Sequence, residues 1–372
     1  MDVVETGTGE DEMRDASANS VPSTSLENAE SGLSRYTVIA LWSVIAVFAV
    51  ITLARSVAVD VPIRDPGGKI VLERLWIAVE WLLALVLADA LVASLWRHRS
   101  LRAIPRMLRE RWPWCRVWPV GMAVFAYHLV YVCYRNLKSW DAFNGNRDHE
   151  LQAVDRVIFG GQTPAVLLHD LFGEHAAAIV FADIYNSFPK LVTVSVVGTL
   201  VFVRPVSRAY LFLCSMIWVW ILGTATYYAV PSLGPFATYP QDFAGLTETA
   251  VTRSQQSYLE QRTHLLANPA AHDAYSSISA FASLHVGVTC VILLMAHRYG
   301  HRRLAIALGV YLAAATVSTI YVGMHFVVDD VAGVLIAMLA VRLGQLTVGS
   351  RVSPRREPRP EPDQEPERET AA

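Results

Sequence analysis

The sequence predicts an all-α membrane protein, a polytopic bundle of about eight transmembrane helices. Three observations predict this fold class. Hydrophobic residues make up 53% of the 372 positions. Charged residues make up only 17%, against roughly 25% in soluble domains. Apolar runs of about 17 to 25 residues recur along the chain, the length that an α-helix needs to cross about 30 Å of hydrocarbon.

The few charged residues gather at the two ends of the chain. Of the 64 Lys, Arg, Asp and Glu residues, ten lie in residues 1–35 and eleven in residues 351–372, which leaves 43 for the 315 residues between them. A soluble protein of that size could not cover its surface with so few charges. The composition therefore excludes an ordinary cytosolic enzyme and a secreted disulfide scaffold. The net charge of −2 also argues against a nucleic-acid binder.

The ends of the chain and its apolar runs define the predicted organisation. Residues 1–34 are Ser-rich and acidic, and residues 346–372 are Pro-rich and charged, so both are expected to be disordered cytoplasmic tails. Residues 35–116 are expected to hold two extra transmembrane helices and a basic cytoplasmic loop. The eight predicted spans lie near residues 36–54, 75–96, 117–134, 176–203, 209–230, 281–296, 304–324 and 326–345.

Arginines predict the orientation of these spans. Residues 97–116 hold seven Arg and one Glu, and further arginines mark every second connection and the C-terminal tail. The positive-inside rule makes that side cytoplasmic, with both termini, in a multi-pass protein of the cell membrane. The long loops 135–175 and 231–280 are then outside. In the first of them, apolar residues on one helical face predict a short helix in the outer interface, namely Leu151, Val154, Val157 and Ile158.

The last predicted span opens with a candidate catalytic pair in the segment STIYVGMHFVVDDVAG. His325 and Asp329 are four residues apart, so on a helix they share a face. The carboxylate can fix the tautomer of the imidazole and leave the second ring nitrogen as a nucleophile or base. The alternative is a polar helix start, in which Asp329 or Asp330 serves the amides of the first turn.

A second candidate motif, FASLHVG, opens the sixth predicted span. His285 would lie at the same membrane face as His325, where it could protonate a leaving group and then deprotonate an acceptor. Ser283 could bind an oxyanion together with nearby amides at the helix start. The alternative is an N-cap serine followed by an interfacial histidine. Two such motifs at matched depth favour the catalytic interpretation.

These motifs resemble those of a known family. SLH followed forty residues on by HxxxD resembles the second and third motifs of the type 2 phosphatidic acid phosphatase superfamily. The loop AVPSLGPF and both motifs are more similar to its inositol phosphorylceramide synthase-like, or inositolphosphotransferase, branch. The resemblance covers residues 117–345, which would be the six-helix phosphatase-type catalytic core. It implies that His325 attacks phosphorus, Asp329 orients it, His285 is acid and then base, and Ser283 contacts the phosphoryl oxygens.

The chain departs from the phosphatases where they carry positive charge. They have an Arg six residues before the nucleophilic His, where this chain has Thr319, and their Lys-containing first motif is absent. Both departures fit the transferase branch better. A phosphoryl site still needs cations, and Arg135 and Lys138 are the best candidates. The alternative for this pair is snorkelling at the end of a span.

The sequence therefore predicts a membrane phosphotransferase or phosphatase that acts on a lipid phosphoester at the extracytoplasmic face, through a phosphohistidine. Its partners would be a phospholipid or lipid phosphate, an alcohol or water acceptor, and the bilayer. No cofactor or metal is implied, because HxxxD lacks a third ligand. The alternative is a transporter or flippase that uses intramembrane ionisable residues, centred on Asp183 and Lys190. For these two residues, a structural polar network inside the bundle is the other interpretation.

Overall fold

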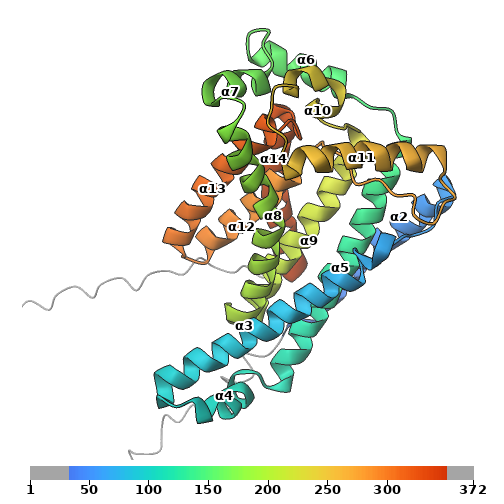
Figure 1. Ribbon diagram of the computed structural model, residues 1–372. Coiled ribbons are helices and arrows are strands. Elements are labelled where there is room, and N and C mark those ends of the chain that lie inside the picture. The colour runs from blue at the N-terminus through green and yellow to red at the C-terminus, as the bar shows by residue number, and fades with distance from the viewer. Residues whose placement is uncertain (1–32, 350–372) are drawn as a thin grey trace, which may run out of the picture.

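The structure, a computed structural model, describes residues 33–349 and confirms the predicted helical bundle (Figure 1). All regular secondary structure in this range is helical. Apart from a few residues at their inner ends, the predicted disordered tails lie outside the described residues. Seven described helices are long and apolar enough to cross a membrane: α2 (Arg35–Val59), α3 (Leu72–His98), α5 (Trp114–Trp140), α8 (Ala176–Phe202), α9 (Val206–Ala229), α13 (Arg302–Tyr321) and α14 (Val327–Val348).

The sixth predicted span is shorter than the sequence suggests. It forms α12 (Leu284–Arg298), a helix of 15 residues, which at 1.5 Å per residue extends for about 22 Å. Two thirds of its residues are buried against neighbouring helices. A helix enclosed by protein in this way does not have to match the thickness of the hydrocarbon, because its ends meet other parts of the chain.

The centre of the bundle is α9, which packs closely against α14 and also contacts α5 and α12. Small residues allow this close approach. A Cβ atom added at Gly344 of α14 would lie 2.5 Å from the hydroxyl of Ser215 on α9. Close contact between small residues is typical of helices that associate in a bilayer, where apolar burial alone does not drive packing.

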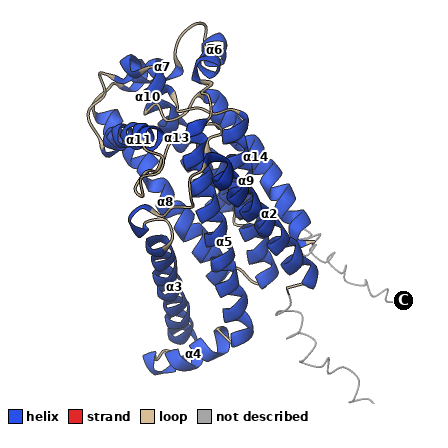
Figure 2. Cartoon of the chain, turned by 90° about the vertical axis from the view of Figure 1, so that its right-hand side faces the viewer, coloured by secondary structure: helices blue, strands red, loops and turns tan. Residues whose placement is uncertain are grey.

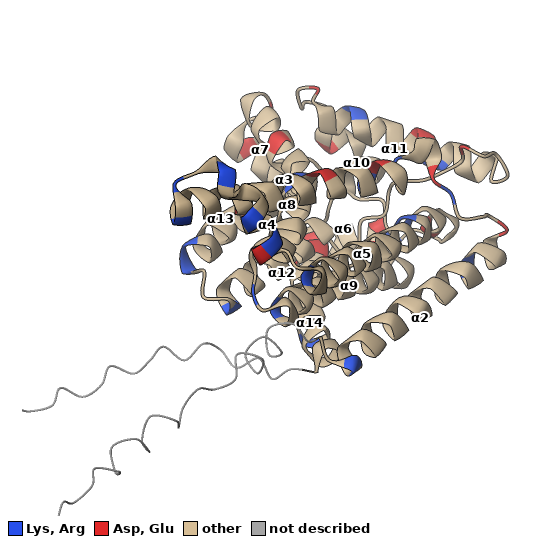
Figure 3. Ribbon diagram, turned by 90° about the horizontal axis from the view of Figure 1, so that it is seen from below, with Lys and Arg blue, Asp and Glu red and all other residues tan. Residues whose placement is uncertain are grey.

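A layer of short helices covers one end of the bundle, and arginines gather at the other. The covering layer consists of α6 (Asp148–Ile158), α7 (Pro164–Phe172), α10 (Pro235–Thr238) and α11 (Ala250–Ala267), and lies at the top of Figure 1. At the opposite end, Lys and Arg lie around α4 (Ile104–Arg111) and near α12 and α13 (Figure 3). The first and last described helices also meet there, since the hydroxyl of Thr37 donates to the carbonyl of Val348 at 3.0 Å (Figure 2).

Helix α3 is held at that arginine-rich end by an ion pair. Arg111 of α4 donates from Nε and Nη2 to the two oxygens of Asp89, at 2.8 and 2.6 Å. Asp89 is buried, with 8% of its surface exposed. This bidentate pair fixes one end of a helix whose surface is otherwise mostly exposed.

Candidate active site

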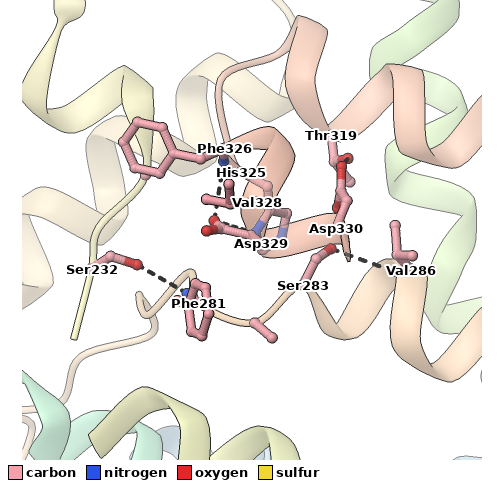
Figure 4. Close-up of polar contacts among 12 residues, drawn as sticks. Ser232, Phe281, Ser283, Val286, Thr319, His325, Phe326, Val328, Asp329 and Asp330 are labelled. Carbon is pink, nitrogen blue, oxygen red and sulfur yellow. Dashed lines mark hydrogen bonds and ion pairs between the residues drawn. The ribbon is translucent and has the colours of Figure 1, made fainter. Parts of the chain in front are cut away.

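His325 lies in the tight turn between α13 and α14, directly before the first residues of α14 (Figure 4). Its Nδ1 atom faces Oδ2 of Asp329 at 3.3 Å, and the same oxygen accepts the backbone N–H of Phe326 at 3.0 Å. Both His325 and Asp329 are buried. The carboxylate thus has both functions considered from the sequence, because it caps the first turn of α14 and also orients the imidazole.

His285 lies at the start of α12, beside His325. The two imidazole ring centres are 5.9 Å apart. On its other side the His285 ring stacks on Tyr185 and lies against Phe188, with both ring centres at 4.2 Å. The two motifs are also joined through the backbone, since Ser283 N–H donates to the carbonyl of Asp329 at 3.0 Å. The fold therefore brings together two histidines that are forty residues apart in the sequence.

Both histidines line one cavity of about 300 Å³ inside the bundle, and the two cations predicted from the sequence line it with them. Arg135 lies over the ring of Tyr275, at 5.5 Å from its centre, and Nζ of Lys138 lies 5.5 Å from the ring centre of Tyr227. Within residues 33–349, neither cation forms an ion pair with a carboxylate. Their positive charge is therefore available to an anion in the cavity.

Ser283 is placed differently from these four residues. It is fully buried and is not among the residues that line the cavity. Its hydroxyl caps α12 by accepting the N–H of Val286 at 3.4 Å. In the structure Ser283 therefore serves as the N-cap, and its contact with phosphoryl oxygens stays a prediction.

Thr319 occupies the position at which the phosphatases carry an arginine. Its hydroxyl donates to Oδ2 of Asp330 at 3.0 Å (Figure 4), and both side chains are buried. A neutral hydrogen-bonding group at this position completes a packed contact between α13 and α14. The cations of this site come from α5 instead.

The surroundings of His325 favour its neutral form. Burial lowers the pKa of the imidazole to about 4, with the charge of Lys138 acting in the same direction and that of Asp330 in the opposite one. Because this value lies well below neutrality, the ring keeps a lone pair at physiological pH. A neutral imidazole is the form that can attack an electrophile.

Two acidic residues of α6, not predicted from the sequence, support the turn that carries His325. Asp155 accepts the N–H groups of Val327 and Val328, the first two residues of α14, at 2.8 and 3.3 Å. Asp148 accepts the N–H groups of Leu233 and Gly234, at 2.9 Å each. The loop containing Gly234 packs against the His325 turn. A Cβ atom on this glycine would lie 2.6 Å from the carbonyl of Met324.

Helix α6 confirms the short helix predicted after span three, and its other side carries acidic residues. Of the four apolar residues predicted on one face, Val154, Val157 and Ile158 are exposed, but Leu151 is buried. Asp148 and Asp155 are buried as well. The polar stripe opposite the apolar face was a signal that α6 binds protein through its acidic side. The partners of these acidic residues could not be found from the sequence, because they lie 85 to 173 residues away.

Replacing Asp155 is expected to destabilise the His325 turn. Asp155→Ala would leave two part-buried N–H groups at the start of α14 without their acceptor, at a cost of about 1–3 kcal/mol. We expect a lower thermal unfolding midpoint in detergent, measured by intrinsic fluorescence. Asp170→Ala, at an exposed position of α7, is the matched control. Equal midpoints for the two variants would show that the Asp155 contacts do not support the turn.

The two residues on which the transporter alternative is centred, Asp183 and Lys190, do not line the cavity that holds the histidines. Asp183 and Lys190 are both exposed on α8, so the predicted polar network inside the bundle is wrong for them. Among the described residues no ion pair joins the two side chains. The ionisable residues that converge inside the protein are instead the histidines and cations at one end of the cavity.

Comparison with known proteins identifies one family for this chain. A family model described as the PAP2 superfamily matches residues 149–343, more than half of the chain. The matched range includes His285, His325 and Asp329, whereas Arg135 and Lys138 precede it. No curated protein and no solved structure matches the chain.

Proposed function

The chain belongs to the PAP2 superfamily, and from this premise we propose that it is a membrane enzyme that transfers a phosphoryl or phospho-head group from a lipid phosphoester through a phosphohistidine at His325. One observation carries the proposal. Two imidazoles with ring centres 5.9 Å apart line the same cavity as two cations that have no carboxylate partner among the described residues. A phosphoryl group fits between such rings, and nearby cations stabilise its charge.

In the first step, the lone pair on the ring nitrogen of His325 attacks phosphorus, while Asp329 holds the N–H on the other nitrogen. The phosphorus–oxygen bond to the leaving group breaks, and the leaving oxygen takes a proton from His285. The negative phosphoryl group between the rings favours the protonated form of His285 at this stage. A phosphorus–nitrogen bond to His325 has then formed, and the leaving group departs as an alcohol.

In the second step, His285 takes the proton of an acceptor hydroxyl, whose oxygen attacks phosphorus. The phosphorus–nitrogen bond breaks and returns its electron pair to His325. Water as the acceptor gives a phosphatase, and an alcohol gives a transferase. We favour a transferase of the inositol phosphorylceramide synthase-like branch, because Thr319 and Asp330 fill the place of the phosphatase arginine.

We place the site at the extracytoplasmic face of the cell membrane. The cavity end that holds His285 and His325 lies under the layer of short helices, at the end of the bundle opposite the arginine-rich loops. The positive-inside rule assigns that arginine-rich end, together with both termini, to the cytoplasm.

An acceptor assay tests the proposal. Purified protein would receive phospholipids labelled in the phosphate, first alone and then with inositol or a lipid alcohol. We expect labelled product to form, and an increase with an alcohol acceptor would identify a transferase. Free phosphate as the sole product would identify a phosphatase. The proposal fails if no labelled product of either kind forms with any phospholipid.

A further inference from the structure

The cavity extends beyond the two histidines into the interior of the bundle. On α5 its lining residues recur every three or four positions from Lys138 down to Val124, which places them along one face of the helix. At 1.5 Å per residue, this face is about 21 Å long. The cavity is therefore longer than a phosphoryl group requires.

The opposite wall is α8, and it runs in the same direction away from the site. Tyr185 and Phe188 of α8 touch His285, so they mark the end near the histidines. Val196 and Val197 line the cavity two to three turns further along the helix. The cavity therefore has a near end at the two histidines and a far end at Val196 and Val197.

The chemistry of the lining changes between these two ends. Near the histidines the lining carries positive charge, from Arg135 and Lys138. At the far end it is mainly apolar, with Val124, Val196 and Val197, although three residues with a polar group also line this part, namely Tyr127, His128 and Thr193. This order matches a molecule with an anionic head and a hydrocarbon tail. The length also suits a tail, since half of the hydrocarbon of a bilayer is about 15 Å thick.

Helix α3 forms the side of the cavity that faces the membrane. It contributes Arg74, Ile77 and Ala78 to the lining. It packs on α8 but contacts α5 only slightly, and most of its own surface is exposed. Arg74 is exposed and lies over the ring of Tyr131, 6.0 Å from its centre, so its charge is at the rim. A lipid tail could enter sideways from the bilayer between α3 and α5.

From this arrangement we infer that the far part of the cavity holds one hydrocarbon chain of the substrate, and that Val124, Val196 and Val197 set the longest chain that is accepted. The inference rests on the proposed function, because it places the phosphate of the same molecule between His285 and His325. It adds a specificity determinant that lies about 20 Å from the reacting atoms.

A chain-length profile tests this inference. Alkyl phosphates from octyl to octadecyl would be assayed, with wild type and with Val197→Phe, for released alkyl alcohol, which the first step forms in a transferase and in a phosphatase alike. A phenyl ring at position 197 shortens the cavity, so we expect kcat/KM for octadecyl phosphate to fall at least about tenfold relative to octyl phosphate. Val194→Phe, on the exposed side of the same helix, should keep the wild-type profile. Identical profiles for all three proteins would overturn the inference.

Photo-crosslinking gives a second measurement that requires neither turnover nor a folded variant. Wild type would be irradiated with octadecyl phosphate that carries a diazirine at the end of its chain. We expect the label on α5 or α8 near Val124, Val196 and Val197, and less label when unmodified octadecyl phosphate competes. Label confined to outward-facing residues such as Val194 would overturn the inference.

Together the two measurements separate this inference from the proposed function. If the far residues are labelled but wild type releases no product from any phosphoester, the chain site stands and the proposed reaction fails. If turnover requires His325 but the chain-length profiles are identical and the label lies outside the cavity, the reaction stands and the chain site fails.

Discussion

His325→Ala is expected to lower the rate of phosphoryl transfer by about 10⁴-fold or more, the size of loss seen when a covalent nucleophile is removed. His325 lines the cavity and is buried in its neutral form beside Asp329. We assign His285, which lines the same cavity, to the proton and not to phosphorus. The measurement is the initial rate with phosphate-labelled phospholipid, together with the amount of label that stays on the protein.

Two comparisons make this result specific. His272→Ala alters an exposed histidine in the connection between α11 and α12, and it should keep the wild-type rate. His285→Ala should slow both half-reactions but still leave a nucleophile to label. Full activity in His325→Ala would contradict the covalent mechanism, and so would equal labelling of the His325→Ala protein and wild type.

Lys138→Met is expected to lower the rate of phosphoryl transfer by about 10²–10³-fold, the effect of removing one group that stabilises charge in a transition state. Methionine keeps an unbranched side chain of nearly the same length and removes its charge. Lys138 lines the cavity with both histidines and has no carboxylate within ion-pair distance among the described residues. Lys138 is half-buried, and partial burial of a cation without a carboxylate partner is a cost to folding.

This cost gives Lys138→Met an unusual combination of effects. The rate should fall, but the thermal unfolding midpoint should stay the same or rise, because an unpaired cation has been removed from the interior. A structural role at the end of a span would instead lower the midpoint and leave the rate nearly unchanged. Lys190→Met is the matched control, since Lys190 is exposed on α8. It should change neither quantity.

Local features of the sequence predicted much of the fold and the centre of the site. Seven of the eight predicted spans are helices long enough to cross a membrane, because apolar length alone decides whether a helix can span hydrocarbon. The relation between His325 and Asp329 was also predictable. A spacing of four residues places both side chains on one helical face, whatever surrounds the helix.

Contacts between distant segments could not be predicted in the same way. Asp155 reaches Val327 across 172 residues, and nothing near either residue indicates the other. Ser283 resembles a phosphate ligand, which stays a prediction, and in the structure it caps α12. A serine before a helix suits both functions, and only the direction of its hydroxyl separates them. Asp183 and Lys190 were misplaced because an unbroken apolar run does not show which side of a helix faces the bundle.

The sequence by itself determined that this protein is a helical membrane protein with a histidine–aspartate pair at the start of its last helix. Both properties depend on composition and on spacing within one helix. The tertiary structure decided that His285, Arg135 and Lys138 meet His325 in one cavity, and that the cavity continues toward Val124 and Val197. The physical reason is that helix packing, set by contacts among side chains far apart in the chain, fixes which faces turn inward.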